Sequence, residues 1–455
     1  MLLKEVFKHF NFAVVKTIQM KNILKSIPII LLLLSNSLAA QEIISIGKAE
    51  VISNLKKNNL ALKISLQEFY AAKADYKQTN AVFLPNITAS HTGISTTNPL
   101  MAFGSKLNQG ILTQNDFNPA LLNNPTQTQN FATKIEIQQP LINLDGFYQR
   151  KAAKSKMEAM SLKTERTTDY MALEVLQAYM QLQLAYKAIG VLEKALETAE
   201  VHQKIATNNL QQGFMLKADV LSVAIRVTEV KNQLQVAKSN MQNASNYLSF
   251  LMQTKEDVVY KPSEELTVVS FDKEPILISE NRADIKAMQL AKKGYEALNK
   301  ADKMAFLPRL NAFGSYEMYD NKLLQGAANG YLIGAQLSWD IFKGSQRFGK
   351  AQKSKAALEK SKLSYNQYVA KSNLEFQKAK RQLADAKNSL ELNKLALQQS
   401  EESLRIRKNR FKEGLEKTAD LLVSETQFAQ KELAYYQTIY QYNFTQAYLD
   451  FLTKQ

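Results

Sequence analysis

The chain has 455 residues, a formal net charge of +16 at pH 7, 45% hydrophobic residues and no cysteine. Without cysteine the fold uses no disulfide and no thiolate metal site, and the three histidines are too far apart in sequence to show a metal-ligand spacing. The lysines are dispersed among glutamate and glutamine, which is typical of solvated helix faces and not of a nucleic-acid site. No catalytic triad, zinc-protease motif or nucleotide-binding loop occurs, so the sequence predicts neither an enzyme nor a cofactor.

Residues 1–40 have the pattern of a signal peptide. Lys21 and Lys25 precede an apolar run, and small residues follow it up to Ala40. The run is shorter than the ~20 residues that a membrane-spanning helix needs, so we expect export and not anchoring. Met20 is a possible true start, because the residues before it add nothing that a signal needs.

The sequence repeats itself with a period of about 200 residues. The segment AVFLPNITA at 81–89 is similar to MAFLPRLNA at 304–312, and later pairs of similar segments are also separated by about 200 residues. Solenoid repeats run only ~20–50 residues, so this period indicates a duplicated half-molecule. We expect a first repeat over 41–255, a linker over 256–280 and a second repeat over 281–455.

The first repeat begins with a predicted helix and two predicted strands. Helical periodicity over 43–82 ends at Pro85. Period-two alternation then predicts strands at about 84–97 and 130–140. The segment 98–128 between them contains three prolines and is expected to be a loop.

A long helical hairpin is predicted over 147–255. Apolar residues step by threes and fours from Val175 to Ala199 and again from Val220 to Leu251, as in a coiled-coil seam. Gly213 marks the tip, since a glycine just past a helix end tolerates the left-handed backbone of a cap. A helix of about 66 residues before the tip would span ~100 Å.

The second repeat has the same order of predicted elements. Strands are expected at about 309–319 and 330–342, and a hairpin over 345–453 with its tip at Gly414. Its strand-joining loop is much shorter, and insertions gather in exposed loops, so the loop end should face outward. The seam of this hairpin is more polar and aromatic, which indicates either a wet interior or drift after duplication.

Four strands of around ten residues cannot close a sheet, and open edges would remain. Strands of ~9–11 residues suit a bilayer crossing, where only closed barrels are permitted. An eight-stranded barrel is filled by its own side chains, so a pore needs at least three chains and twelve strands. The same alternation also occurs in soluble sheets, which remain an alternative.

The duplicated order resembles the TolC-like outer-membrane factor family. The residues that carry the resemblance are the two FLP segments at 83–85 and 306–308, the QPLI segment at 139–142, the two tips and the loop text NPLMAFGSKLNQG at 98–110. The resemblance implies a mostly α fold with a membrane β-barrel portion, assembled as a homotrimer with a twelve-stranded barrel on an α-helical barrel. It also implies a place in the outer membrane, with the helical tunnel in the periplasm.

The function that the resemblance implies is passive export through a duct of a tripartite efflux or type I secretion system. A periplasmic adaptor and an inner-membrane transporter would be its partners, and outer-membrane lipid would surround its barrel. The alternative is a soluble periplasmic coiled-coil adaptor or structural protein. Adaptors usually carry one hairpin flanked by compact β-domains, whereas two hairpins are predicted here.

The resemblance also assigns roles at the tips. Adaptor docking falls on the tip residues Gly213, Phe214, Met215, Gly414 and Leu415. A periplasmic gate falls on Asp420, Asp219, Phe411 and Glu416, with three copies of Asp420 forming a ring that favours cations.

The gate departs from the best-known pattern of the family. Val423 replaces a second carboxylate, Phe411 a hydrogen-bonding tyrosine, and Glu416 stands where a basic residue is often found. Asp219 and Asp420 also lie near helix starts, so capping is an alternative role that does not exclude gating.

Overall fold

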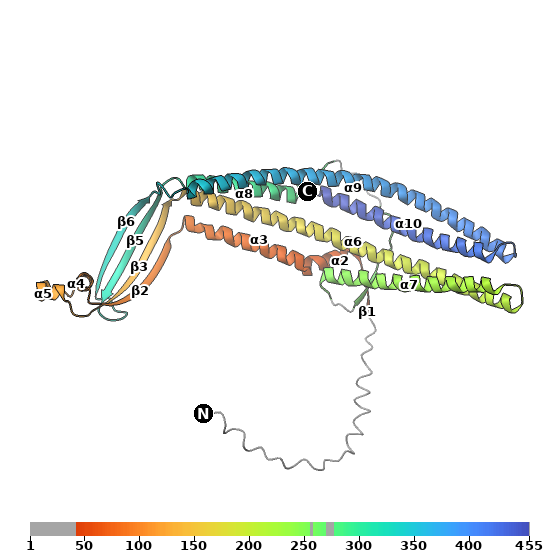
Figure 1. The fold of residues 1–455 in the computed structure, drawn as a ribbon, viewed down its shortest axis with the longest axis horizontal. Helices are drawn as coiled ribbons and strands as arrows, with labels where there is room; N and C mark the ends of the chain where they lie inside the picture. The colour runs from red at the N-terminus through yellow and green to blue at the C-terminus, as the bar shows by residue number, and fades with distance from the viewer. Residues whose placement is uncertain (1–41, 255–257, 270–276, 455) are drawn as a thin grey trace, which may run out of the picture.

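The computed structural model describes residues 42–254, 258–269 and 277–454. The expected signal peptide over 1–40, with its alternative start at Met20, lies outside these ranges. The molecule is a long rod with a β-sheet at one end and two hairpin tips at the other (Figure 1).

The first repeat is a helix, a strand pair and a hairpin. Its elements are α3 (Leu60–Gln78), β2 (Asn86–Thr96), β3 (Thr128–Ile142), α6 (Leu144–Gln211) and α7 (Lys217–Met252). Helix α6 has 68 residues, which at ~1.5 Å per residue corresponds to ~100 Å. A helix of this length cannot surround a globular core, so it packs along its partners as a rod.

The second repeat follows the same order. Its elements are α8 (Ala283–Met304), β5 (Arg309–Asp320), β6 (Ala328–Ser338), α9 (Gln346–Lys412) and α10 (Thr418–Thr453). The four strands form one antiparallel sheet in the order β2-β3-β5-β6. The two strand pairs therefore join through β3 and β5, which places the repeats side by side.

The expectation of a single helix over 43–82 is wrong. The segment holds β1 (Glu42–Ile46), α2 (Lys48–Asn58), α3 and a short 3-10 turn η1 (Thr79–Val82). Asn59 separates the two helices: its side chain accepts from Leu62 N at 3.2 Å and donates to Leu251 O at 2.8 Å. An asparagine that caps a helix from outside interrupts an otherwise helical pattern.

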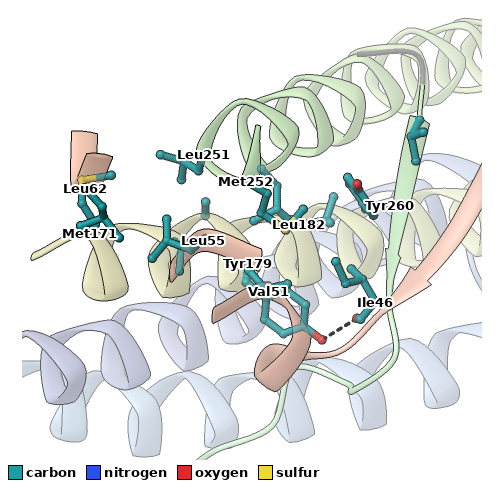
Figure 2. Packing of buried hydrophobic residues seen from close by; sticks show 14 residues of the cluster. Ile46, Val51, Leu55, Leu62, Met171, Tyr179, Leu182, Leu251, Met252 and Tyr260 are labelled. Carbon is teal, nitrogen blue, oxygen red and sulfur yellow. Dashed lines mark hydrogen bonds between the residues drawn. The ribbon is translucent and has the colours of Figure 1, made fainter. Parts of the chain in front are cut away.

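Strand β1 pairs in parallel with β4 (Val258–Pro262), a contact that sequence reasoning missed. Ile46, Val258 and Tyr260 of this pair enter the largest core cluster, between α2, α6 and α7 (Figure 2). Tyr179 of α6 lies at its centre, 2% exposed, and donates to Ile46 O at 3.2 Å. Burial, together with a hydrogen bond to Glu264, raises the pKa of Tyr179 to about 12.

The expectation of a loop over 98–128 is also wrong in part. Helix α4 (Pro99–Asn108), the 3-10 turn η2 (Gln114–Phe117) and helix α5 (Pro119–Asn123) lie there. Pro99 and Pro119 do not break these helices, because both stand at the first helical turn, where proline is favoured.

Two strand ends also differ from the prediction. β3 continues past Pro140 to Ile142, with a register shift at that point, because proline has no N–H to donate to the ladder. β6 ends at Ser338 and not at 342.

The seams predicted for the first hairpin are packed between α6 and α7, with Val175, Leu182, Val223 and Val230 fully buried. The second hairpin packs differently. Along α10 a series of stacked rings links Tyr440, Phe444, Tyr448 and Phe451 at centroid distances of 6.2–6.3 Å.

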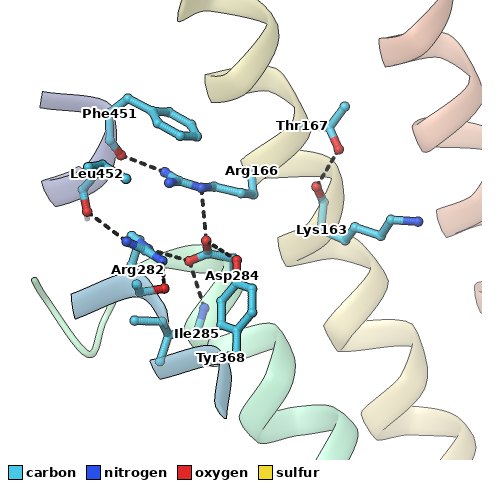
Figure 3. A network of polar contacts seen from close by, with 10 residues as sticks. Lys163, Arg166, Thr167, Arg282, Asp284, Ile285, Tyr368, Phe451 and Leu452 are labelled. Atoms are coloured by element: carbon cyan, nitrogen blue, oxygen red, sulfur yellow. Dashed lines mark hydrogen bonds and ion pairs between the residues drawn. The ribbon is translucent and has the colours of Figure 1, made fainter. Parts of the chain in front are cut away.

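A polar junction fixes the end of α10 against α6, α8 and α9 (Figure 3). Asp284 Oδ1 lies 2.6 Å from Arg282 Nε, and its Oδ2 lies 3.2 Å from Arg166 Nε and accepts from Tyr368 at 2.7 Å. The two guanidinium groups donate to the carbonyl oxygens of 451 and 452, the last turn of α10. Cations at a helix C-terminus complement its dipole, so this junction anchors α10.

Charge opposes burial within this junction. Burial raises the pKa of Asp284, but hydrogen bonds from Arg282 and Tyr368, with the charge of Arg166, outweigh it and lower the pKa overall. Burial, followed by the hydrogen bond to Asp284, raises the pKa of Tyr368 to about 12.

Candidate functional site

The sheet has one apolar and one polar face, and the register shows it row by row. One row across the four strands is Ile87, Ile137, Gly314 and Ile333. A second such row is Ala89, Ile135, Tyr316 and Tyr331. Directly opposite residues share a face, so these rows form one apolar surface. Much of it is exposed: Ile333 is 78% and Tyr331 79% accessible.

The rows that alternate with these two point to the other face and are largely polar. One row is Thr88, Glu136, Ser315 and Leu332, and the next is Ser90, Lys134, Glu317 and Gly330.

Ion pairs on this polar face lie along β3 and between β3 and β5. Lys134 Nζ lies 2.9 Å from Glu136 Oε2 and 3.4 Å from Glu317 Oε1, and Tyr319 donates to Glu317. An exposed apolar face and a charged opposite face are typical of a membrane barrel with a wet interior.

The sheet ends in two unpaired strands, β2 and β6. Within the described residues nothing covers either edge: β2 and β6 are exposed along most of their length. Such edges are templates for pairing with another chain. The sheet is therefore an open fragment that further strands can complete.

The two hairpin tips have the same backbone. Gly213 and Gly414 have φ values of 78° and 72°, in the left-handed region that favours glycine. The following amides, of Phe214 and Leu415, donate back to the carbonyls of 209 and 410 at 2.8 and 2.9 Å. These bonds satisfy the carbonyls of the last helical turn, so each glycine closes its helix and turns the chain.

The tips leave apolar side chains in solvent. Phe214 is 82%, Leu216 73% and Leu415 66% exposed. Large apolar side chains gathered at one exposed end mark a contact surface for a partner.

Between the tips lies a hollow of about 1000 Å³, walled by both hairpins. It brings together six of the nine predicted site residues: Phe214, Met215, Asp219, Phe411, Gly414 and Glu416. The structure places the other three, Gly213, Leu415 and Asp420, outside its lining.

Asp219 and Asp420 do not cap their helices as N-cap residues. Leu216 and Lys417 occupy those positions, and each aspartate is the third residue of its helix. A carboxylate in the first turn still stabilises a helix through its dipole. Asp219 faces the hollow, whereas Asp420 is exposed beside it.

Glu416 is held within its own hairpin. Its carboxylate lies 2.5 Å from Arg407 Nη1 and 2.9 Å from Arg410 Nε, and its side chain is 10% exposed. The acidic residue at 416 thus closes the tip of the second hairpin onto α9.

One contact tying the first hairpin to the second was missed by sequence reasoning. His202 Nε2 of α6 lies 2.9 Å from Glu425 Oε1 of α10, and Lys408 Nζ of α9 lies 3.7 Å from the same oxygen. Phe411 packs edge-on against the His202 ring at 6.0 Å. His202, Glu425, Lys408 and the Phe411 ring form a contact between the hairpins at the wall of the hollow, here called the hairpin clasp. A lone histidine gives no sequence signal for such a contact.

Within the described parts of the chain, no group of three or more histidine, cysteine, aspartate or glutamate side chains could hold a metal ion. None of the described helices combines the length and the apolar character that crossing a membrane requires.

Comparison with known proteins gives one family and a set of similar structures. The model of the family described as outer membrane efflux protein matches residues 51–253 and 276–453. No curated protein matches the chain.

The similar solved structures include outer-membrane channels and membrane proteins. A membrane protein from Pseudomonas aeruginosa superposes with a TM-score of 0.78 at 17% identity, covering 89% of this chain and 93% of that one. The CmeC outer membrane channel of Campylobacter jejuni gives 0.77 at 18% identity, covering 89% and 85%. The outer membrane protein VceC of Vibrio cholerae gives 0.74 at 15% identity, covering 89% and 96%. At these identities the likeness shows a shared fold over nearly the whole rod.

Proposed function

Since the chain belongs to the outer membrane efflux protein family, we propose that three copies of it complete one barrel in the outer membrane and one helical tunnel in the periplasm. The chain is an outer-membrane efflux channel subunit, and its fold is that of TolC-like channels. The trimer and the twelve-stranded barrel are the proposal.

The observation that carries the trimer is the open, two-faced sheet. Its edges β2 and β6 are free to pair, and the alternating rows separate an apolar face from a charged one. In lipid every backbone polar group must be satisfied, so the edges must close on strands of other copies. Two copies would give eight strands, a barrel that its own side chains fill, and three give a lumen. The charged rows with Lys134 and Glu317 would line that lumen.

At the other end, we place adaptor docking on the tips. The exposed apolar residues Phe214 and Leu415 and the turning glycines Gly213 and Gly414 support this assignment. A periplasmic adaptor would connect the tips to an inner-membrane transporter that drives the export. The chain itself would act as a passive duct and not as an enzyme.

We also place the periplasmic gate at the tips. Asp420, exposed in the first turn of α10, would form a carboxylate ring when three copies meet, and such rings favour cations. Asp219 and Phe411, in the wall of the hollow, would hold the two hairpins together, and Glu416, paired with Arg407, would fix the tip of the second hairpin.

The alternative of a soluble coiled-coil protein does not account for the sheet. A soluble protein would leave the rows of Ile333 and Tyr331 in water, since within the described residues no element covers them. Membrane lipid covers such a surface without a further partner.

Cysteine cross-linking tests the trimer, because the chain has no cysteine of its own. Thr88→Cys in β2 and Leu332→Cys in β6 place one thiol at each edge, both on the polar face. A short bifunctional maleimide should give covalent dimers and trimers and nothing larger in membranes that contain the double variant. The single variants are the control and should give no covalent trimer. A double variant that stays monomeric would contradict the trimer.

A further inference from the structure

The segment between β2 and β3 is a folded unit at the free end of the sheet (Figure 1). Lys106 Nζ of α4 lies 2.8 Å from Asp116 Oδ1, and Thr113 N donates to Asp116 Oδ2 at 2.8 Å. Phe103 and Phe117 pack edge to face at 5.7 Å. We call residues 98–127 the outer cap. Contacts between its parts give it one defined shape, unlike a connecting loop.

The outer cap lies on the polar face of the sheet. Gln109, 4% exposed, donates from Nε2 to Asn130 Oδ1 and to Gln129 O, both at 2.8 Å. Asn130 is two residues before Ala132 and four before Lys134, so by strand alternation its side chain shares the polar face with Lys134. Ala102 and Ser105 of α4 are also buried. The three residues Ala102, Ser105 and Gln109 are spaced by three and four positions, so they lie on the same side of the helix.

The opposite side of α4, with Leu100 and Leu107, is apolar and exposed, and Met101 lies beside it. Leu100 is 81%, Met101 50% and Leu107 58% accessible. Three large apolar side chains on one short helix form a patch that calls for a partner.

Lipid does not fit as that partner, because the apolar rows that would face lipid lie on the other face of the sheet from Asn130. In a closed barrel the polar face points inward, so the cap extends over the mouth and not over the membrane. The cap also follows directly on β2, the edge strand that would meet the next copy. The surface that α4 meets across the mouth is therefore the same surface of another copy.

We propose that the three outer caps meet over the external mouth of the barrel through Leu100, Met101 and Leu107 and form a hydrophobic constriction there. This inference rests on the proposed trimer. The chain would then narrow at both ends, with carboxylates at the periplasmic tips and an apolar ring at the outer mouth. Hydrophobic constrictions restrict conduction by excluding water, without any charged gate.

Only one repeat supplies such a cap. The corresponding connection in the second repeat, between β5 and β6, is a short turn over 321–327. Three copies therefore bring three caps and not six, which leaves room for each to reach the axis. The duplication has been kept in the barrel wall and lost at its outer mouth.

Conductance measurement tests the constriction in the full-length protein. The triple variant Leu100→Ser, Met101→Ser and Leu107→Ser changes only exposed side chains and keeps the buried contacts of α4. Removing an apolar constriction should raise the single-channel conductance in a planar bilayer at least about twofold. The matched control is Leu323→Ser with Leu324→Ser, which removes exposed leucines from the β5–β6 turn and should leave the conductance unchanged.

A second variant tests the contact between copies directly. Leu100→Cys, alone in the cysteine-free chain, should give a disulfide-linked dimer on oxidation, because two of three thiols near the axis can pair. Ile333→Cys, equally exposed but on the apolar face, should stay monomeric.

The outcomes separate this inference from the proposed function. Unchanged conductance of the triple variant would contradict the hydrophobic constriction but not the export duct. This result is expected if the outer cap inserts into lipid instead. Monomeric Leu100→Cys in trimers already proven by edge cross-linking would equally overturn it. No channel from the unmodified protein would overturn both proposals.

Discussion

Removal of the Asp284 carboxylate should strongly destabilise the chain. In the junction at the end of α10, Asp284 is, among the residues that the structure describes, the carboxylate in direct contact with both Arg282 and Arg166, whose side chains are 3% and 11% exposed. Asp284→Ala leaves two buried positive charges facing each other. Breaking a buried pair in this way costs about 3–5 kcal/mol of unfolding free energy, because the remaining charge is left without compensation.

The magnitude is measured by urea titration of the detergent-solubilised protein, followed by far-ultraviolet circular dichroism. Glu68→Ala is the matched control, since it breaks the pair with Lys163, which has a comparable N–O distance of 2.8 Å but side chains that are 54% (Lys163) and 47% (Glu68) exposed. Exposed pairs contribute at most ~1 kcal/mol, so the control should be nearly neutral.

A rescue variant checks that stranded charge is the cause. Adding Arg166→Met to Asp284→Ala removes one of the two uncompensated charges and should recover at least about 1 kcal/mol. If Asp284→Ala costs no more than Glu68→Ala, or if the rescue variant is less stable than Asp284→Ala alone, the reasoning about this junction is wrong.

Further predictions concern the clasp, a tip and the outer cap. His202→Ala should lose about 1–2 kcal/mol of coupling with Glu425 in a double-mutant cycle of unfolding free energies, and a coupling near zero would show that the hairpin clasp is not formed. Gly414→Ala forces a residue with a Cβ to a φ of 72° and should lower the same free energy by about 1–2 kcal/mol, whereas no change would refute the tip backbone. A hydrogen bond from Lys106 and two from residue 113 lower the pKa of Asp116 to about 2, so its contribution to the outer cap is present above the ordinary value of 3.8 and is lost as the pH falls toward 2. Amide protection across the cap, corrected for intrinsic exchange, should decline over that window, and Asp116→Asn should abolish the pH dependence.

The rod was predictable because its signals are local and periodic. The residue pattern from Val175 to Ala199 repeats every three or four positions over many turns, so the seam buried between α6 and α7 follows from it. The tips follow from Gly213 and Gly414, since each stands alone at the end of a long periodic run. The alternation of polar and apolar residues likewise located the strands within a few residues.

Features set by contacts between distant segments were not predictable. The break between α2 and α3 depends on Asn59 reaching Leu251 O, 192 residues away, and the sequence nearby stays helical in pattern. The pairing of β1 with β4 joins segments more than 200 residues apart and too short to show a period. Pro99 and Pro119 stand in the first turn of a helix, where proline is favoured, whereas a proline later in a helix would break it. The prediction of a loop was wrong because the sequence alone does not show where a helix begins.

The candidate site divides in the same way. The resemblance assigned roles to nine tip residues, and six of these nine line one hollow. The clasp of His202 with Glu425 could not be foreseen, because the two residues are 223 positions apart on separate hairpins. The sequence predicted that Asp219 and Asp420 lie near helix starts. Only the backbone conformation shows that each is the third residue of its helix and not the N-cap.

Ion conductance of the purified chain in a planar lipid bilayer tests the central claim most directly. The account predicts discrete single-channel steps, and the same steps from protein whose edges are joined covalently into a trimer through Thr88→Cys and Leu332→Cys. Protein that is helical by circular dichroism yet gives no conductance steps would contradict the claim that three open sheets close into one duct. Steps from the unlinked protein that are lost in the covalent trimer would contradict it equally.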